Sequence, residues 1–251
     1  MRLPRLYIHN ELKAGKSVPL PENTFRHCIQ VLRLPDGAPL ILFNGDGNDY
    51  RATLERVSKK QAFAVVTDRI ANTTESPLEL SLVQGVSKGD HMDFSIQKAV
   101  ELGVKHIHPI ICARSQRIPT DRLHRRQNRW KMIAISACEQ TGRSRIPEFS
   151  LPVSFTHWFQ QSCLAQHRLI LDPYAQQTLS EFIKIKGLGQ HNGNRVVELL
   201  IGPEGGFTVE EITDAVKSGA TAVSLGPRTL RTETASVVAL SLCQAHWGDL
   251  Q

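Results

Sequence analysis

The sequence predicts an α/β protein with a small β-rich part at its N-terminus. Up to about residue 71, short apolar runs rich in β-branched and aromatic residues follow one another. From Leu78 onward, such runs alternate with segments of helical periodicity. Strands that alternate with helices are typical of a mostly parallel sheet covered by helices. The chain of 251 residues is long enough for these two parts to be separate domains.

The N-terminal part is predicted to be a small β-barrel or sandwich. Its apolar runs lie in the segments PLILFNGDGNDYRATLERV and QAFAVVTDRI. Between two of these runs stands Asn44-Gly45-Asp46-Gly47, which favours a tight turn between antiparallel strands. The polar stretch ANTTESP at residues 71–77 lacks periodicity and ends in a proline. We place the boundary there, which gives predicted domains of residues 1–71 and 72–251.

The second part begins with a strand, a helix and another strand. LELSLVQGV at residues 78–86 is predicted to be the first strand, and VKHIHPII at 104–111 the second. Asp90 is expected to cap the helix HMDFSIQKAVEL, which ends just before Gly103. An amphipathic helix is predicted over residues 129–140, because apolar residues recur there at i, i+3, i+4 and i+7.

The remaining elements continue the alternation. Strands are predicted at residues 168–172, 196–201 and 222–225, and helices at about 209–218 and 233–247. Thr208 and Glu211 have the spacing of a capping box, which places the helix start directly after a glycine-rich loop.

Composition excludes several classes of protein. Hydrophobic residues make up 41% of the chain and charged residues 22%, as in soluble globular proteins. No apolar run approaches the roughly 18 residues of a membrane span, and the N-terminus lacks the apolar core of a signal peptide. We therefore expect a cytoplasmic protein.

The cysteines and histidines do not indicate a disulfide framework or a metal site. The five cysteines are odd in number and scattered, and we expect reduced, mostly buried thiols at Cys28, Cys112, Cys138, Cys163 and Cys243. His106 and His108 share one face of a predicted strand, but no third ligand lies nearby in the sequence. No metal is expected.

Positive charge is concentrated in one segment. The formal net charge is +6, and residues 113–145 carry nine Lys or Arg against two acidic residues. A single run of this kind is more often a solvated helix face, but arginine forks also match the geometry of phosphate groups. RNA is therefore a plausible partner.

Two glycine-containing loops follow predicted strands. GPEGGF follows LLI, and GPRTLRTETA follows VSL. Ligands of open parallel sheets bind beyond the carboxyl ends of the strands, so the two loops are expected to form one pocket. Glycine allows close approach of the main chain, which suits an adenine or another polar cofactor edge. Neither loop has the spacing of a dinucleotide fingerprint or a P-loop, and tight turns with helix caps remain the alternative.

Together, IGPEGGFTVEE and SLGPRTLRTETA closely resemble the two carboxyl-terminal signatures of the RsmE family, SPOUT-class RNA methyltransferases that modify a uridine of 16S ribosomal RNA at N3. The resemblance spans nearly the whole chain, through RLYI, HCIQVLRL, SKGDHMDFSIQKAVELGVKHIHPI, RWKMIAISACEQTGRSRIP and LDPYA. Thr229 departs from the aliphatic residue expected there. The resemblance implies a PUA-like, RNA-binding β-barrel over residues 1–71 and a SPOUT-type α/β methyltransferase domain with a C-terminal trefoil knot over 72–251. It also implies a homodimer that uses S-adenosylmethionine.

The resemblance also implies site residues. The cofactor pocket would be formed by Leu200, Ile201, Gly202, Gly205, Leu225, Gly226, Leu230, Arg231 and Thr232. Methylation at uridine N3 requires removal of a proton or stabilisation of the developing anion. Arg231 is the candidate for stabilising charge on the uracil oxygens, and Glu204 is a weaker candidate for accepting the proton. Glu233 is the other carboxylate nearby, but a helix N-terminal residue favoured by the dipole is the better interpretation of it.

The target base must be unpaired or flipped, because N3 lies on its Watson-Crick edge. The candidate RNA-binding residues are Arg5, Arg26, Arg33, Arg114, Arg143 and Arg145, together with Arg2. Residues 139–145 are the best candidates for reaching the substrate across a dimer interface. Two other functions stay open: a non-catalytic RNA-binding factor, and a methyltransferase for tRNA or for another atom of ribosomal RNA.

Overall fold

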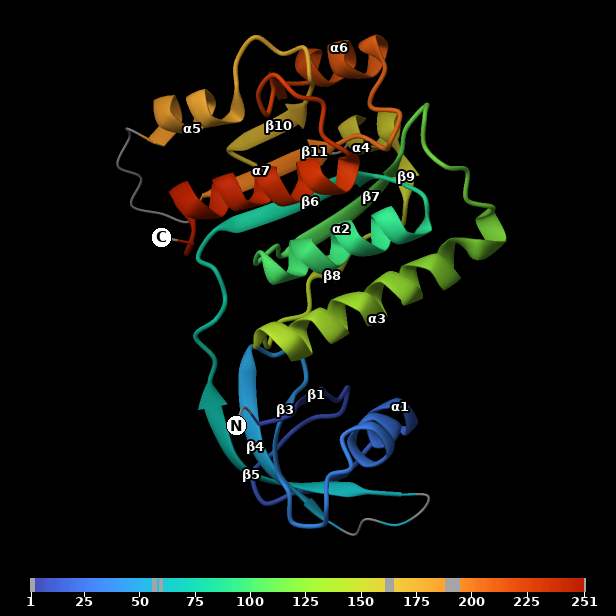
Figure 1. Cartoon of the computed structure of the whole chain (residues 1–251), viewed down its shortest axis with the longest axis vertical. Coiled ribbons are helices and arrows are strands. Elements are labelled where there is room, and N and C mark those ends of the chain that lie inside the picture. Colours follow the sequence, from blue (N-terminus) through green and yellow to red (C-terminus); the bar gives the residue numbers. More distant parts are fainter. Residues whose placement is uncertain (1–2, 56–57, 59–60, 161–164, 188–194, 251) are drawn as a thin grey trace. The chain divides into compact units, whose positions relative to one another are not determined.

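The computed structural model of the chain describes residues 3–55, 58, 61–160, 165–187 and 195–250 (Figure 1). The chain divides into two compact units. Unit 1 comprises residues 1–75 and 135–146, and unit 2 comprises residues 76–134 and 147–251. The predicted boundary between residues 71 and 72 assigned residues 135–146 to the second domain, whereas in the structure they belong to unit 1. A stretch near the middle of the chain therefore completes the N-terminal unit.

Unit 1 is built on a five-stranded sheet of order β1-β3-β4-β5-β2. Its strands are β1 (Arg5–Tyr7), β2 (Ser17–Pro19), β3 (Pro39–Phe43), β4 (Asn48–Glu55) and β5 (Phe63–Ala71). β3 and β4 pair antiparallel across the predicted turn, where Gly45 and Gly47 have φ angles of 95° and 89°. L side chains rarely adopt such angles, so the two glycines allow the turn. The helix α1 (Glu22–Phe25) and the following π-helix (Arg26–Val31) were not predicted.

The core of unit 1 follows from alternation along its strands. Buried positions occur at every second residue from Tyr50 to Leu54 in β4, and at Ala64 and Val66 in β5. Side chains of successive strand residues point to opposite faces, so one face of the sheet is apolar. The buried cluster includes Leu6, Leu40, Leu42, Leu54 and Val66.

Unit 2 contains a parallel sheet of order β12-β10-β11-β6-β7-β8, with β9 also paired to β7. Its strands are β6 (Glu79–Gly85), β7 (His106–Ile111), β8 (Glu148–Phe149), β9 (Val153–Ser154), β10 (His167–Leu171), β11 (Val196–Ile201) and β12 (Thr221–Val223). The five predicted strands of this part are confirmed. β8 and β9, of two residues each, were not predicted.

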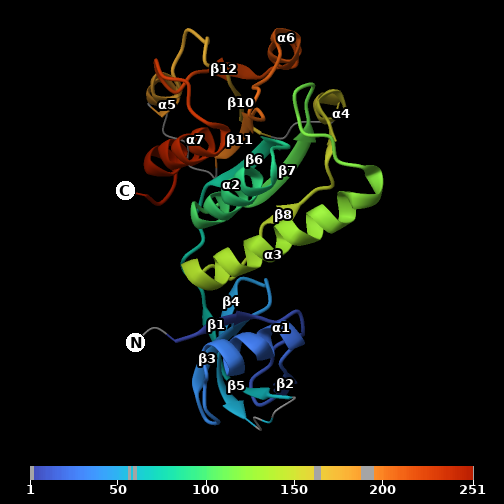
Figure 2. The same ribbon diagram turned by 45° about the vertical axis from the view of Figure 1, so that its right-hand side comes forward.

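Helices cover both faces of this sheet. They are α2 (Gly89–Glu101), α4 (Phe155–Gln160), α5 (Leu179–Gly187), α6 (Val209–Lys217) and α7 (Thr232–Trp247), with a 3₁₀ turn at Thr120–Arg122. The helix α3 (Leu123–Thr141) belongs to unit 2 up to Ala134 and to unit 1 from Ile135 on. α2 and α7 pack side by side on one face (Figures 1 and 2). On the other face, Val83, Ile170 and Leu200, which lie opposite one another in the register, pack against Phe155 and Ala215 of α4 and α6.

Two predicted helix starts needed correction, and one was confirmed. Asp90 does not cap α2, because it lies within the first turn and Lys88 occupies the cap position without a side-chain hydrogen bond. α3 starts at Leu123, six residues before the predicted helix. The capping box of Thr208 and Glu211 is present at the start of α6.

The described cysteines are free and buried, as predicted, at Cys28, Cys112, Cys138 and Cys243. Burial raises the pKa of the Cys28 thiol to about 11 and of the other three to about 12. These thiols are therefore protonated at neutral pH and weakly nucleophilic. Cys163 lies outside the described residues.

Within the described ranges, no helix is long and apolar enough to cross a membrane. The same part of the chain contains no group of three or more His, Cys, Asp or Glu side chains placed to hold a metal ion.

Candidate active site

A cavity of about 410 Å³ lies at the carboxyl ends of the parallel strands of unit 2. It is lined by residues 171–174 after β10, 201–207 after β11, and Thr229, Leu230 and Thr232 after β12, together with Arg114 after β7. This is the sheet edge where ligands of open α/β folds bind. The structure thus brings both glycine-containing loops to one cavity.

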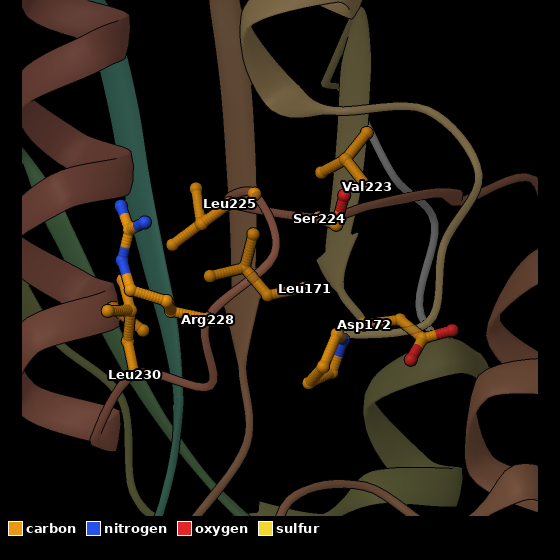
Figure 3. A pocket seen from close by; sticks show the side chains of 10 residues that line it. Leu171, Asp172, Val223, Ser224, Leu225, Arg228 and Leu230 are labelled. Carbon is orange, nitrogen blue, oxygen red and sulfur yellow. The ribbon is translucent and has the colours of Figure 1, made fainter.

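A smaller recess of about 50 Å³ shares part of this lining (Figure 3). Five residues line both spaces: Leu171, Asp172, Pro173, Leu230 and Ala235. The remaining lining of the recess consists of residues 223–226 and Arg228. In Figure 3, Leu171 and Leu225 lie side by side, whereas the carboxylate of Asp172 points away from them. The recess is therefore an apolar extension of the larger cavity.

The side-chain amide of Gln84, near the end of β6, connects the segments around the cavity through hydrogen bonds. Its fully buried amide nitrogen donates to the carbonyls of Gly85, Ile201 and Gly202 at 3.2, 3.4 and 3.3 Å. The same nitrogen lies 3.1 Å from the hydroxyl of Thr232, and the amide oxygen accepts a hydrogen bond of 2.8 Å from Ser236. One side chain thereby joins β6, the loop after β11 and the start of α7.

Close approach of the main chain explains two of the glycines. A Cβ on Gly85 would lie 2.6 Å from the nitrogen and Cδ of Pro203, and 2.9 Å from the carbonyl carbon of Gly202. A Cβ on Gly202 would lie 3.1 Å from the main chain of Gly206 and Phe207. The loop of residues 202–206 therefore folds tightly on itself and against the end of β6.

Glu204 anchors this loop to α2. Its carboxylate accepts a 2.7 Å hydrogen bond from the main-chain N–H of Lys88, the residue at the cap of that helix. Negative charge at a helix N-terminus is favoured by the helix dipole. Glu204 thus supplies from a distant loop the capping interaction that the sequence assigned to Asp90.

We expect Glu204→Ala to lower the free energy of unfolding by about 0.5–2 kcal/mol, the usual cost of losing a helix cap. Glu204→Gln should lose less, because its amide oxygen still accepts the Lys88 hydrogen bond. Urea denaturation of the two variants measures the difference. Equal stability of Glu204→Ala and the wild type would show that water replaces the contact at no cost.

Two residues predicted for the pocket line neither space. Leu200 is fully buried in β11, among the core residues of the face covered by α4 and α6. Arg231 occupies the cap position of α7 with an exposed side chain. In the part of the chain described, its guanidinium has no ion pair or hydrogen bond. It stands between Leu230 and Thr232, which both line the cavity, and is free to meet an anionic group.

The other predicted cofactor residues divide between the two spaces. Ile201, Gly202, Gly205 and Thr232 line the large cavity, Leu225 and Gly226 line the recess, and Leu230 lines both.

Two of the arginines predicted for RNA binding are buried in unit 1. The Arg5 side chain is 8% exposed, and its guanidinium pairs with Asp49 at 2.6 Å and donates to the Ser144 hydroxyl at 3.0 Å. Arg143 is 3% exposed and pairs with Glu75 at 2.9 Å. Their donors are directed into the fold, so these two residues hold residues 135–146 against the sheet of unit 1.

The other arginines are exposed. Arg26 pairs with Glu22 at 2.5 Å, and Arg33 has a φ angle of 52°. The guanidinium of Arg145 lies over Gly47, where a Cβ would meet it at 2.7 Å. In unit 2, Arg114 lines the large cavity and donates to the carbonyls of Gly205 and Phe207 at 2.8 and 3.3 Å. Arg2 lies outside the described residues.

No role was predicted for Gln84, Asp172, Tyr174 or Ala235. A signal existed for the first, because a glutamine that follows the apolar residues Leu82 and Val83 in a buried strand requires a hydrogen-bond partner. Asp172-Pro173 is also typical of a turn, and the Asp172 carboxylate indeed accepts a 3.0 Å hydrogen bond from the N–H of Tyr174.

Comparisons with known proteins agree with this geometry. Residues 74–244 match the RNA methyltransferase domain family, and residues 20–67 match the RNA methyltransferase PUA domain family. Ribosomal RNA small subunit methyltransferase E of Buchnera aphidicola from Acyrthosiphon pisum is 33% identical over 255 residues, covering 100% of this chain and 96% of its own length. The Bacillus subtilis protein of the same name is 29% identical and covers 86% of this chain, with 84% of its own length matched.

Two solved structures have the same fold over the whole chain. A Legionella pneumophila protein described as a methyltransferase, in complex with S-adenosylmethionine, has a TM-score of 0.91 and 39% identity, with 99% of this chain and 100% of that chain covered. Ribosomal RNA small subunit methyltransferase E of Neisseria gonorrhoeae, bound to S-adenosylmethionine, has a TM-score of 0.89 and 36% identity, with both chains covered completely.

Proposed function

The chain belongs to the ribosomal RNA small subunit methyltransferase E (RsmE) family, and on that premise we propose that it methylates N3 of one uridine of 16S ribosomal RNA, with S-adenosylmethionine as methyl donor. The observation that carries the proposal is the single cavity at the strand ends, which both signature loops line. Relatives of matching length and fold are named ribosomal RNA small subunit methyltransferase E or have S-adenosylmethionine bound in their solved structures.

The residues of the cavity fit this cofactor. A volume of about 410 Å³ lies within the range of roughly 300–1,000 Å³ of small-molecule sites. Gly202 and Gly205 line the cavity without side chains, so a ligand can approach the main chain closely there, and Leu225, Gly226 and Leu230 offer the adjoining apolar recess. When bound, the cofactor supplies a methyl group on a positively charged sulfur. We propose that Ile201 and Thr232 complete the binding surface, while Leu200 and Arg231 flank it.

Arg231 is the proposed electrostatic partner of the uracil. Removal of the N3 proton leaves negative charge on the uracil oxygens, and a free guanidinium at the cavity edge would stabilise it. Glu204 remains the weaker candidate for accepting the proton, because its carboxylate already accepts the N–H of Lys88. The carboxylate oxygen Oε1 of Glu233 already contacts the ring nitrogen Nδ1 of His91 at a distance of 3.0 Å.

The function is tested with small ribosomal subunits that lack the modification. Incubation with the protein and S-adenosylmethionine should create one new reverse-transcription stop at a uridine near the 3′ end of 16S RNA, since methylation at N3 blocks the pairing edge. Arg231→Ala should weaken this stop by a factor on the order of 10²–10³ while still binding the cofactor.

Two outcomes would contradict the proposal. Cofactor binding without any stop would shift the substrate to tRNA or to another RNA. Failure to bind the cofactor would favour a non-catalytic RNA-binding factor.

We further propose the finer fold of the family, with a C-terminal trefoil knot and a PUA-like barrel in the N-terminal domain. The tight loop of residues 202–206, fixed by Gln84 and Thr232 against the start of α7, supports the knot. The twisted five-stranded sheet and the PUA family match support the barrel. A crystal structure with S-adenosylmethionine would test both.

The domain roles are proposed likewise. Residues 1–71 would bind RNA and residues 72–251 would transfer the methyl group, in a cytoplasmic homodimer that acts during ribosome assembly. Arg26, Arg33, Arg114 and Arg145 are the proposed direct RNA contacts, because their side chains are exposed. Arg5 and Arg143 would act by holding unit 1 together. Light scattering after gel filtration tests the dimer.

A further inference from the structure

Tyr174 is an aromatic side chain at the mouth of the cavity. It is 88% exposed, more than any other large hydrophobic residue in the described part of the chain, and it lines the large cavity but not the recess. Soluble proteins expose single apolar side chains without consequence, so exposure alone decides nothing. Its position beside a ligand cavity is what calls for an explanation.

The lining of the cavity has two distinct sides. Residues shared with the recess, such as Leu171 and Leu230, form the inner side. Ile201, Gly202 and Phe207 line only the large space but are buried, so they belong to the inner side as well. Tyr174, Arg114 and Val209 also line only the large space, and all three are exposed, Val209 to 76%. A cofactor seated on the inner side would leave the outer side for the second reactant, which must enter from solvent.

The main chain of Tyr174 is fixed, whereas its ring is not. The N–H of Tyr174 donates to the Asp172 carboxylate at 3.0 Å, and the N–H of Ala175 donates to the Asp172 carbonyl at 3.1 Å. The N–H of Asp172 in turn donates to Val223 of β12 at 3.0 Å. Among the described residues, the ring has no aromatic or hydrogen-bonding partner. The main chain therefore fixes where the side chain begins, and the ring remains available for contact.

A flipped uridine needs a flat aromatic surface on which to stack, and the Tyr174 ring is such a surface. A base whose N3 is to react must leave its pairing partner and loses its neighbours in the stack. Proteins that hold splayed-out bases commonly replace that stacking with an aromatic side chain. We propose that Tyr174 stacks on the target uracil and holds it on the outer side of the cavity, facing the methyl donor. This inference rests on the proposed function and names the residue that receives the substrate base.

The test compares Tyr174→Ala with Tyr174→Phe, which keeps the stacking face, in the full-length protein. Alanine should lower kcat/KM for unmodified small subunits about 5- to 150-fold, the range for loss of one base–aromatic stack. Phenylalanine should stay within about threefold of the wild type. The Kd of S-adenosylmethionine, measured by calorimetry, should be unchanged in both variants, and their Tm should match because the side chain is exposed.

A second readout is independent of turnover. Subunits reconstituted with 5-iodouridine at the target position should photocross-link to the wild-type protein through residue 174, as shown by peptide mapping, and the cross-link should disappear in Tyr174→Ala.

The outcomes separate the two proposals. If the wild type methylates the subunit and Tyr174→Ala does so equally well, the stacking role is wrong and the proposed function stands. If Tyr174→Ala loses cofactor affinity in the same proportion as kcat/KM, the ring covers the cofactor instead of the base. If the wild type binds the cofactor but transfers no methyl group to small-subunit RNA, the proposed function fails and the stacking role fails with it.

Discussion

Gly85→Ala is expected to weaken S-adenosylmethionine binding by about 100-fold or more. The added methyl group would stand 2.6 Å from the main-chain nitrogen and ring of Pro203, so the loop of residues 202–206 must move away. A misplacement of about 1 Å in a preorganised site can cost that factor. The measurement is the Kd by calorimetry, followed by the rate of methyl transfer at saturating cofactor.

The matched control is Gly89→Ala. This glycine lies four positions later, at the start of α2, and its Cβ would have nothing within 4 Å. The affinity of the Gly89→Ala variant for S-adenosylmethionine should equal that of the wild type. A Kd of Gly85→Ala within threefold of the wild type would mean that the loop yields at little cost.

Gln84→Leu should lower the free energy of unfolding by about 1–3 kcal/mol and weaken cofactor binding as well. The leucine keeps the volume but leaves the Ile201 carbonyl without this donor, whereas the Ser236 hydroxyl keeps the Thr232 carbonyl as an acceptor at 2.9 Å. Each buried polar group left unsatisfied costs about 1–3 kcal/mol. Denaturation in urea, with and without S-adenosylmethionine, measures both effects.

Thr232→Val provides the comparison. It removes the 2.6 Å hydrogen bond to the Gly202 carbonyl, which still accepts from Gln84, so its cost should be about 1 kcal/mol. A loss in Gln84→Leu no larger than that in Thr232→Val would refute the central role of the buried amide.

The elements that could be predicted are those whose periodicity is long or sharply bounded. The five predicted strands of unit 2 are confirmed, because each is a short segment rich in Leu, Ile, Val or Ala and bounded by polar residues or glycine. β8 and β9 have two residues each, and α4 has six, so none of them carries a usable period. The first turns of α3 read LHRRQN, and this polar stretch hid the true start of the helix.

The residues of the candidate site also include some that could be predicted from the sequence and some that could not. The two glycine loops could be placed in one pocket, because parallel strands present their carboxyl ends at one edge. The role of Gln84 depends on β6 lying beside β11, and that of Asp172 on β10 lying beside β12. The order of strands in a sheet cannot be predicted from local sequence patterns. The burial of Arg5 and Arg143 likewise depends on tertiary partners, Asp49 and Glu75.

The loop of residues 202–206 is constrained by its own close packing. Gly202 has no room for a Cβ, which would lie 3.1 Å from the main chain of Gly206 and Phe207, and Pro203 packs directly against Gly85. Insertion or deletion of one residue in that stretch would change the register of every later residue at once. Variation among related enzymes should therefore appear as exchanges of rim side chains, such as Thr229, in loops of constant length.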